Sequence, residues 1–245
     1  METPVTLKAL PFIERLRTIK SEHAPDGFTW YGYHTMANIW HVENLLDGKF
    51  EEFLEQTEGR VADIGVADGE LGYFLESLGR DVDLFDWPAT NWNGMRGVRR
   101  LHELLDSRAN VSEIDLDSQF SLPHPRYGLI FFLGILYHLK NPMFVLEALS
   151  SKTKYLLLST RIAAKTSAEG FDMQDLPLAY LVDPSECNND STNYWIFSKT
   201  GLERLLSRSG WAIERWMTVV CTKDSEPARM DRDERAFVLV RSAGS

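Results

Sequence analysis

Three aspartates are the first residues in this sequence whose type and spacing suggest chemistry. Asp63, Asp86 and Asp115 each follow a short run of β-branched or aromatic residues that is typical of a strand. Ligands of open α/β sheets bind at the edge where the carboxyl ends of the strands meet. A carboxylate about twenty residues beyond a glycine loop is placed to accept hydrogen bonds from a ribose diol, and its charge would repel a 2′-phosphate. The pattern therefore predicts a ribose-containing cofactor other than NADP.

The glycine loop itself is Val61-Ala-Asp-Ile-Gly-Val-Ala-Asp-Gly69. Gly65 and Gly69 let the backbone turn from a strand into a helix and approach a ligand closely. A nicotinamide dinucleotide needs G-x-G-x-x-G and room for its pyrophosphate at the helix N-terminus. Asp68 and Glu70 place negative charge there, which a cofactor with an ammonium and a sulfonium tolerates and a pyrophosphate does not. We therefore expect S-adenosylmethionine as cofactor and S-adenosylhomocysteine as its product.

The same loop resembles the first motif of class I S-adenosylmethionine-dependent methyltransferases, with Ala67 in place of the middle glycine. The resemblance covers residues 60–240. It implies that Asp63 and the loop backbone hold the methionine portion of the cofactor, while Asp86 binds the ribose hydroxyls. A solvated strand end is an alternative role for Asp115. The other implied cofactor contacts are Trp87 on the adenine, Asp115 on the adenine amino group, Leu116 packing nearby, and Gly134 at the end of the fourth strand.

Two further segments resemble the tRNA wobble-uridine carboxymethyltransferase family, namely Phe132-Leu-Gly-Ile-Leu-Tyr-His-Leu-Lys-Asn-Pro142 and Asn193-Tyr-Trp-Ile-Phe-Ser198. Enzymes of that family use carboxy-S-adenosylmethionine, and an arginine just before the second motif holds part of its extra carboxylate. Thr192 occupies this position here, so the carboxylate would lose its bidentate partner. We therefore expect ordinary S-adenosylmethionine as the donor.

The segment after the fourth strand supplies the candidate catalytic residues. Tyr137 is expected to line the methyl-transfer pocket. His138 is either a general base that takes the acceptor's proton, or a packing residue or cap for the helix beginning at Pro142. Asn193 and Trp195 are candidate walls of the acceptor pocket, with a role as core anchor as the alternative for Trp195. No cluster of His, Asp and Glu has metal-ligand spacing, so no metal is expected.

The elements that must position these residues alternate between strand and helix from residue 60 onward. This alternation predicts a Rossmann-like α/β fold with a seven-stranded, mostly parallel sheet, an antiparallel C-terminal strand pair, and helices on both faces. The expected strands are Val61–Ile64, Asp81–Phe85, Val111–Leu116, Gly128–Leu133, Tyr155–Ser159, Ala212–Val220 and Ala236–Val240. The expected helices are Glu70–Leu78, Met95–Leu105, Pro142–Leu149 and Thr200–Ser207, the last with Thr200 and Glu203 at capping-box spacing.

Two segments fall outside this alternation. Residues 1–59 have a helical pattern, and we expect an N-terminal helical layer or cap beside a methyltransferase domain at 60–245. Residues 161–193 are rich in Asp, Asn, Ser and Pro without a clean period, which indicates an irregular insert in that domain. The layer carries an aromatic cluster that either packs on the sheet or reaches the pocket as a lid, with His34 as its candidate substrate contact. The cluster comprises Trp30, Tyr31, Tyr33, His34 and Trp40.

Composition limits the class of protein. The chain has 245 residues and 44% hydrophobic content, which suffices for a full core. A formal net charge of −10 disfavours nucleic acid as a partner, although four arginines between Arg96 and Arg108 can form a local basic face. Cys187 and Cys221 are far apart and lack CxxC spacing, as in reduced cytoplasmic proteins. No apolar run spans a bilayer and no signal-peptide core is seen, so we expect a cytoplasmic protein with no membrane association.

The predicted reaction is in-line displacement at the methyl carbon of S-adenosylmethionine by an O or N atom of a small-molecule acceptor. Because the sulfonium already activates the methyl group, the protein's main tasks are alignment and exclusion of water. Two alternatives stay open, with the acceptor and the oligomeric state unassigned in each. One is a tRNA wobble-uridine modifying methyl- or carboxymethyltransferase, and the other is an inactive protein that binds the cofactor.

Overall fold

The computed structural model describes residues 3–23, 26–168, 170–187 and 189–244. The chain folds as two parts: the first comprises Met1–Asp115 and Pro123–Phe131, and the second comprises Leu116–Leu122 and Phe132–Ser245. Nine strands occur in the described ranges, where the sequence predicted seven. The two additional strands, both short, belong to the 161–193 insert and the segment that follows it. No helix in these ranges combines the length and the apolar character needed to cross a membrane.

The first part is built on parallel strands. Their order is β3-β2-β1-β4, with every neighbouring pair parallel. All four residues of β1 are buried, because helices cover both faces of a parallel sheet. The strands are β1 (Val61–Ile64), β2 (Val82–Asp86), β3 (Asn110–Glu113) and β4 (Tyr127–Leu133), whose last two residues belong to the second part, and the helices between them are α4 (Glu70–Ser77) and α5 (Arg96–Leu105).

The expected strand Val111–Leu116 is wrong at its C-terminal end. Strand β3 stops at Glu113, and Asp115 lies two residues beyond it. β3 is the outermost strand of the order in this part, and none of its four residues is buried, so little apolar packing favours its extension. The Ile114 amide still donates to the Asp86 carbonyl oxygen at 2.9 Å, which keeps Asp115 beside the end of β2.

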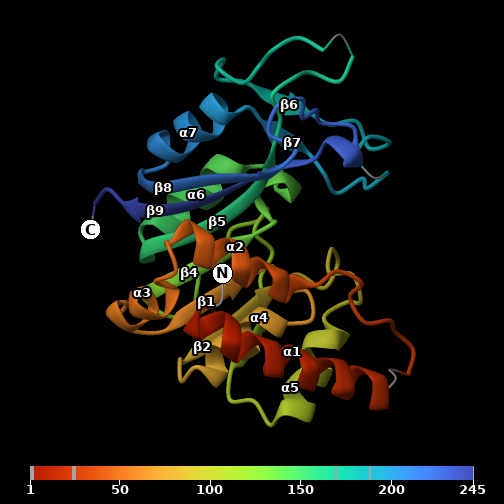
Figure 1. Ribbon diagram of the computed structural model, residues 1–245, viewed down its shortest axis with the longest axis vertical. Coiled ribbons are helices and arrows are strands. Elements are labelled where there is room, and N and C mark those ends of the chain that lie inside the picture. Colours follow the sequence, from red (N-terminus) through yellow and green to blue (C-terminus); the bar gives the residue numbers. More distant parts are fainter. Residues whose placement is uncertain (1–2, 24–25, 169, 188, 245) are drawn as a thin grey trace. The chain divides into compact units, whose positions relative to one another are not determined.

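Helices form most of the described residues between positions 3 and 59. Helix α1 places Val5, Ala9, Phe12 and Leu16 on one buried face, and a hydrogen bond from the Thr6 amide to the Thr3 hydroxyl caps its start. It packs against α2, α3 and α4 (Figure 1). The elements of this layer are α1 (Pro4–Glu22), the 3₁₀ helix η1 (Thr35–Ala37), α2 (Asn38–Leu45) and α3 (Phe50–Gln56).

The second part contains the expected antiparallel C-terminal pair. Strand β9 lies between β5 and β8 and is antiparallel to both, as Figure 1 shows. Its five central residues are buried, so β9 forms a core strand. The elements are η2 (Leu136–His138), α6 (Pro142–Ser150), β5 (Thr153–Ile162), α7 (Lys199–Arg208), β8 (Trp211–Val220), η3 (Met230–Arg232) and β9 (Glu234–Ser242).

The cap predicted for the last helix is wrong. Helix α7 begins at Lys199, and its N-cap is Ser198, whose hydroxyl accepts a hydrogen bond from the Gly201 amide at 2.9 Å. Thr200 therefore lies inside the first turn and does not precede it. Thr200 has Glu203 three residues on, whereas Ser198 has Gly201 there, so the capping-box pattern favoured Thr200.

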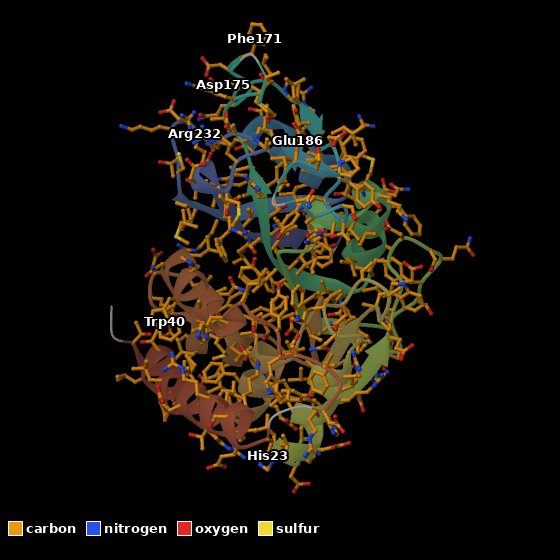
Figure 2. All side chains as sticks on the ribbon, turned by 90° about the vertical axis from the view of Figure 1, so that its right-hand side faces the viewer. His23, Trp40, Phe171, Asp175, Glu186 and Arg232 are labelled. Atoms are coloured by element: carbon orange, nitrogen blue, oxygen red, sulfur yellow. The ribbon has the colours of Figure 1, made fainter. Side chains whose placement is uncertain are left out.

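The 161–193 insert is more ordered than its composition indicated. Strand β6 (Ala179–Leu181) pairs antiparallel with β7 (Trp195–Phe197), and β7 pairs with the end of β5 through Ile162 and Phe197. Phe171 lies at the outer end of the insert (Figure 2), and 67% of this residue is exposed. The insert packs on a small core of its own, formed by Ala163, Met173, Val182, Cys187 and Ile196.

Candidate active site

The glycine loop leaves β1 and enters α4 through a left-handed backbone. Gly65, Ala67 and Gly69 have φ angles of 77°, 53° and 81°. A Cβ at Gly69 would lie 2.8 Å from the rings and methyls of Tyr73 and Val98. Glycine is therefore required at position 69 both for its backbone conformation and for space, as the sharp turn expected from the sequence demands.

Ala67 occupies a left-handed conformation that alanine disfavours. We expect Ala67→Gly to raise the free energy of unfolding by about 0.5–1 kcal/mol, because glycine relieves this strain at the cost of some chain entropy. The matched control is Ala62→Gly in β1, where the backbone is extended and the substitution is expected to destabilise. Urea unfolding of both variants checks this, and a destabilising Ala67→Gly would contradict it.

Asp63, the residue before the last of β1, is a buried carboxyl. Its carboxyl group accepts a hydrogen bond from the Gly72 amide of α4. Burial, with a smaller contribution from the nearby charge of Asp86, raises the pKa of Asp63 to about 7. Its acid form is therefore substantially populated at neutral pH, and a cation placed beside it would favour the carboxylate.

Asp86 connects the end of β2 to the glycine loop. One carboxylate oxygen accepts from the Trp87 amide at 2.8 Å, and the other accepts from the Ala67 amide at 2.9 Å and from Asn91 Nδ2 at 2.8 Å. Asn91 also donates to the Ala67 carbonyl oxygen at 3.2 Å. Burial raises the pKa of Asp86, while these hydrogen bonds oppose the shift. The loop and the acid therefore form one hydrogen-bonded unit.

The first part brings most of the expected cofactor residues to one edge. Because β1, β2 and β3 are parallel, Asp63, Asp86 and Asp115 lie at or just beyond the carboxyl ends of neighbouring strands. Trp87, directly after β2, is half-buried, and so is Asp115. Leu116 is buried and belongs to the second part. The arrangement is that of a ligand edge in an open α/β sheet.

Asp68 and Glu70 face the N-terminal layer. Asp68 is 1% exposed, and its carboxylate accepts from Lys20 Nζ, the Tyr31 amide and Asn93 Nδ2, each at 2.8 Å. Glu70 accepts from the same Lys20 Nζ at 2.6 Å. The sequence indicated no partner for these two carboxylates, but in the structure both pair with the Lys20 ammonium. The two acids and the lysine retain one net negative charge at the start of α4.

His34 lies on the wall of a cavity in this layer. The cavity has a volume of about 100 Å³ and lies beside Glu70 and Lys20. Tyr31 and Tyr33 also line it, with their ring centroids 5.5 Å apart. The Lys20 ammonium lies over the Trp30 ring, 5.2 Å from the ring centroid. This part of the aromatic cluster thus surrounds the Lys20 ion pair.

In the second part, Tyr137 and His138 form the 3₁₀ helix η2 after Gly134. Gly134 has a φ of 79°, and its amide donates to the Ser159 carbonyl oxygen at 2.9 Å. The rings of Tyr137 and His138 have centroids 4.3 Å apart. Burial raises the pKa of Tyr137, and a hydrogen bond from the Arg235 guanidinium to its hydroxyl opposes this.

His138 is not the cap of α6. That role belongs to Asn141, whose side-chain oxygen accepts from the Phe144 amide at 3.3 Å. The imidazole Nδ1 of His138 instead faces Thr192, at 3.0 Å from Oγ1 and 3.2 Å from the carbonyl oxygen. Burial lowers the pKa of His138, so the ring is neutral at pH 7.

Asn193 and Trp195 lie near the same short helix. The Trp195 ring is half-buried, and its Nε1 donates to the Lys140 carbonyl oxygen at 3.3 Å. The Tyr194 amide donates to the Tyr137 carbonyl oxygen at 2.8 Å, which joins the two segments. Asn193 is buried and donates to the Cys187 carbonyl oxygen at 2.9 Å, while its Oδ1 has no hydrogen-bond partner among the described residues. Asn193 therefore supports the insert directly.

No protein-family model matches the sequence, and no curated protein matches it, but many solved structures share the fold. The N-terminal domain of EvdMO1 with SAH bound is 13% identical, with a TM-score of 0.60 over 94% of this chain and 96% of that one. An S-adenosylmethionine-dependent methyltransferase from Mesorhizobium loti is 16% identical, with a TM-score of 0.54 over 80% and 99%. The fold is that of class I methyltransferases.

Three groups of residues make contacts that their sequence neighbourhoods did not predict. Lys20 pairs with acids about fifty positions away, and no local signal marks it. Asn91 precedes α5, where an Asn-x-Asn segment is a recognisable signal for a loop that binds its own backbone. Arg161 and Arg235 share the carboxylate of Asp233, each through Nε at 2.9 Å. This ion triad also reaches the Tyr137 hydroxyl through Arg235.

Proposed function

We propose that this protein transfers a methyl group from S-adenosylmethionine to an O or N atom of a small-molecule acceptor. The observation that carries the proposal is Asp86, which ends β2 and is hydrogen-bonded to the glycine loop in a methyltransferase fold. The SAH bound to the N-terminal domain of EvdMO1, which is S-adenosylhomocysteine, supports the same cofactor here.

The residues present suit a cationic nucleoside. Asp63 is buried and Asp86 is half-buried, the pKa of each is raised, and no cation is among the groups that shift either one. An ammonium or sulfonium at this edge would stabilise their ionised forms. A pyrophosphate would instead add negative charge beside Asp63, Asp86 and the Asp68–Glu70–Lys20 group. The electrostatics therefore support S-adenosylmethionine over a dinucleotide.

Each residue then has a proposed task. Asp63 and the Gly65–Gly69 backbone bind the methionine portion, and Asp86 binds the ribose hydroxyls. For the adenine, we assign Trp87 to one ring face and Asp115 to the amino group, with Leu116 packing nearby and Gly134 giving close backbone approach. Tyr137, His138, Asn193 and Trp195 are assigned to the acceptor side, together with His34.

The bound cofactor supplies an electrophilic methyl group. The chain's own residues align the acceptor, exclude water and accept the proton that an O–H or N–H acceptor loses as its new bond to carbon forms. His138 is neutral at pH 7 and suits this last task. Tyr137, held by Arg235, is suited to fix the acceptor rather than to ionise, because its pKa is raised.

A small-molecule acceptor agrees with the net charge of −10. EvdMO1's N-terminal domain was also crystallised in the presence of SAH and D-fucose, which supports a small polar molecule over tRNA. For the carboxymethyl alternative, Thr192 offers a hydroxyl that already bonds Asp190 and His138, so no guanidinium is available at that position. We also propose that residues 1–59 act as a cap on the 60–245 domain and that the insert at 161–193 shapes its acceptor side. Two free cysteines suit a reducing cytoplasm.

Calorimetry with S-adenosylhomocysteine, and methyl transfer from isotopically labelled S-adenosylmethionine to a panel of hydroxyl- and amino-bearing small molecules, test the proposal. We expect binding and turnover, with no binding of NAD. Absence of S-adenosylhomocysteine binding would overturn the cofactor assignment. Binding without transfer to any acceptor would favour an inactive protein that binds the cofactor. Transfer only from carboxy-S-adenosylmethionine to tRNA would favour a tRNA wobble-uridine modifying enzyme.

The pH dependence of cofactor binding follows from Asp63. Its folded-state pKa of about 7 lies above the ordinary carboxyl value, so the apo protein takes up a proton there as the pH falls. Binding a cationic amino group requires the carboxylate, so the Kd for S-adenosylhomocysteine is expected to rise by up to about tenfold for each pH unit below 7 and to level off above it. Asp63→Asn should give weaker and nearly pH-independent binding. Equal pH slopes in the wild type and the variant would contradict this.

A further inference from the structure

Three side chains in the second part form a hydrogen-bonded series that ends at His138. The Thr192 hydroxyl donates to Asp190 Oδ1 at 2.6 Å, and its amide donates to the same oxygen at 2.9 Å. The Thr192 Oγ1 lies 3.0 Å from His138 Nδ1, and the Thr192 carbonyl oxygen lies 3.2 Å from that nitrogen. One imidazole nitrogen therefore faces two oxygen atoms of a single residue.

These contacts determine which nitrogen carries the proton. A carbonyl oxygen only accepts, and the hydroxyl has one proton, which it gives to Asp190. Both oxygen atoms of Thr192 are thus acceptors toward His138, and Nδ1 must be the donor. In a neutral imidazole the proton on Nδ1 leaves a lone pair on Nε2. No hydrogen bond to Nε2 occurs among the residues that the structure describes.

We propose that Thr192 and Asp190 are positioning residues that hold His138 in its Nδ1–H tautomer, so that Nε2 takes the acceptor's proton during methyl transfer. The inference rests on the proposed function and adds to it how His138 is held in the tautomer that can accept a proton. As the acceptor's oxygen or nitrogen bonds to the methyl carbon, its O–H or N–H bond breaks and the proton moves to Nε2. The resulting imidazolium later returns the proton to water.

Other charges around His138 fit this role. The Asp190 carboxylate favours the imidazolium that forms, and the Arg235 guanidinium of β9 opposes it. Tyr137, from the same 3₁₀ helix, packs against the imidazole with its ring tilted, and it carries no charge at neutral pH because its pKa is raised by burial. With burial, the balance keeps the resting imidazole neutral and therefore able to accept a proton.

The tautomer can be measured without any assay of activity. In protein with ¹⁵N-labelled histidine, the wild type should show a protonated Nδ1 and an unprotonated Nε2 for His138, identified by loss of the signal in His138→Gln. Thr192→Val should convert part of the population to the other tautomer, and Thr192→Ser should restore the wild-type pattern. A protonated Nε2 in the wild type at neutral pH would overturn the proposal.

Kinetic measurements test the proton-accepting role of His138 and its positioning by Thr192 and Asp190. His138→Gln is expected to lower kcat by at least about 100-fold and Thr192→Val by about tenfold, each with little change in the KM for S-adenosylmethionine. Asp190→Asn should shift the acidic limb of the kcat profile to lower pH, because the charge that favours the imidazolium is removed. Ser191→Ala, an exposed neighbour, is the matched control and should leave kcat unchanged.

The two hypotheses fail in different ways. An unchanged kcat in Thr192→Val, or a rise in KM alone, would overturn the positioning role while leaving the methyltransferase function intact. If the wild type binds S-adenosylhomocysteine but transfers no methyl group to any acceptor, the proposed function fails, and the proton-accepting role of His138 fails with it. The ¹⁵N spectrum still decides whether Thr192 fixes the tautomer.

Discussion

Replacing Lys20 by methionine is expected to destabilise the folded protein by about 3–5 kcal/mol, the range seen when one partner of a buried ion pair is removed. The Lys20 side chain is 16% exposed and reaches Asp68, at 1%, and Glu70, at 10%. Methionine retains much of the stem's apolar contact but leaves two carboxylates without their shared cation. Chemical denaturation at neutral pH measures the loss.

The matched control is Lys8→Met on the same helix. Lys8 also pairs with a glutamate, Glu51, but its side chain is 55% exposed, so the change is expected to cost less than about 1 kcal/mol. The pKa of Lys20 is raised, so its contribution to stability is present below the ordinary lysine value and is lost only as the pH rises through the higher folded-state value. Equal effects of the two substitutions would show that the Asp68–Glu70–Lys20 group contributes no more than a surface ion pair.

Replacing Asp86 by alanine is expected to weaken S-adenosylhomocysteine binding by at least about 100-fold, which corresponds to about 2.7 kcal/mol. The variant loses the proposed bonds to the ribose hydroxyls and also the bonds that hold the Ala67 amide and Asn91. Asp86→Asn is expected to be nearly as weak, because its amide nitrogen must face either the Trp87 amide or the Ala67 and Asn91 donors, and it cannot accept from them. Calorimetry measures both variants.

Asp81→Ala is the control for this experiment. Asp81 lies just before the same strand, and its side chain is 79% exposed. It is expected to leave the Kd unchanged within about twofold, since surface substitutions usually change free energies by less than 0.5 kcal/mol. Denaturation curves of Asp86→Ala separate a local loss of binding from global unfolding. If that variant is folded and binds S-adenosylhomocysteine as the wild type does, the ribose assignment is wrong.

The sequence predicted the layered α/β fold because its central strands are buried on both faces. Runs such as Val61–Ile64 and Gly128–Leu133 are almost wholly apolar, and these strands were placed within a residue of their observed limits. The ends of half-exposed elements were harder to place. β3 stopped short of Asp115, and Ser198 took the cap expected of Thr200, since single hydrogen bonds decide such boundaries.

The candidate site was predictable where its residues follow strands and unpredictable where they meet through tertiary contacts. The turns at Gly65 and Gly69 follow from local backbone needs. The contact of Thr192 with His138 joins residues 54 positions apart, and nothing in either neighbourhood indicates it. The same holds for the pairing of β6 in the insert with β7 just after it, because three-residue strands carry too little periodicity to be recognised.

The ion pair between α1 and the glycine loop also has a consequence for the order of folding. During synthesis α1 leaves the ribosome well before residues 68–70, and Lys20 then has neither carboxylate to bind. An isolated helix of 19 residues with a mixed surface is marginal in water. Helix α1 can pack on α2 and α3 before then, but its ion pair with Asp68 and Glu70 forms only after β1 and the start of α4 have emerged. We therefore expect α1 to reach its full stability only once the chain has been made through residue 70, the loop that is proposed to bind the cofactor included.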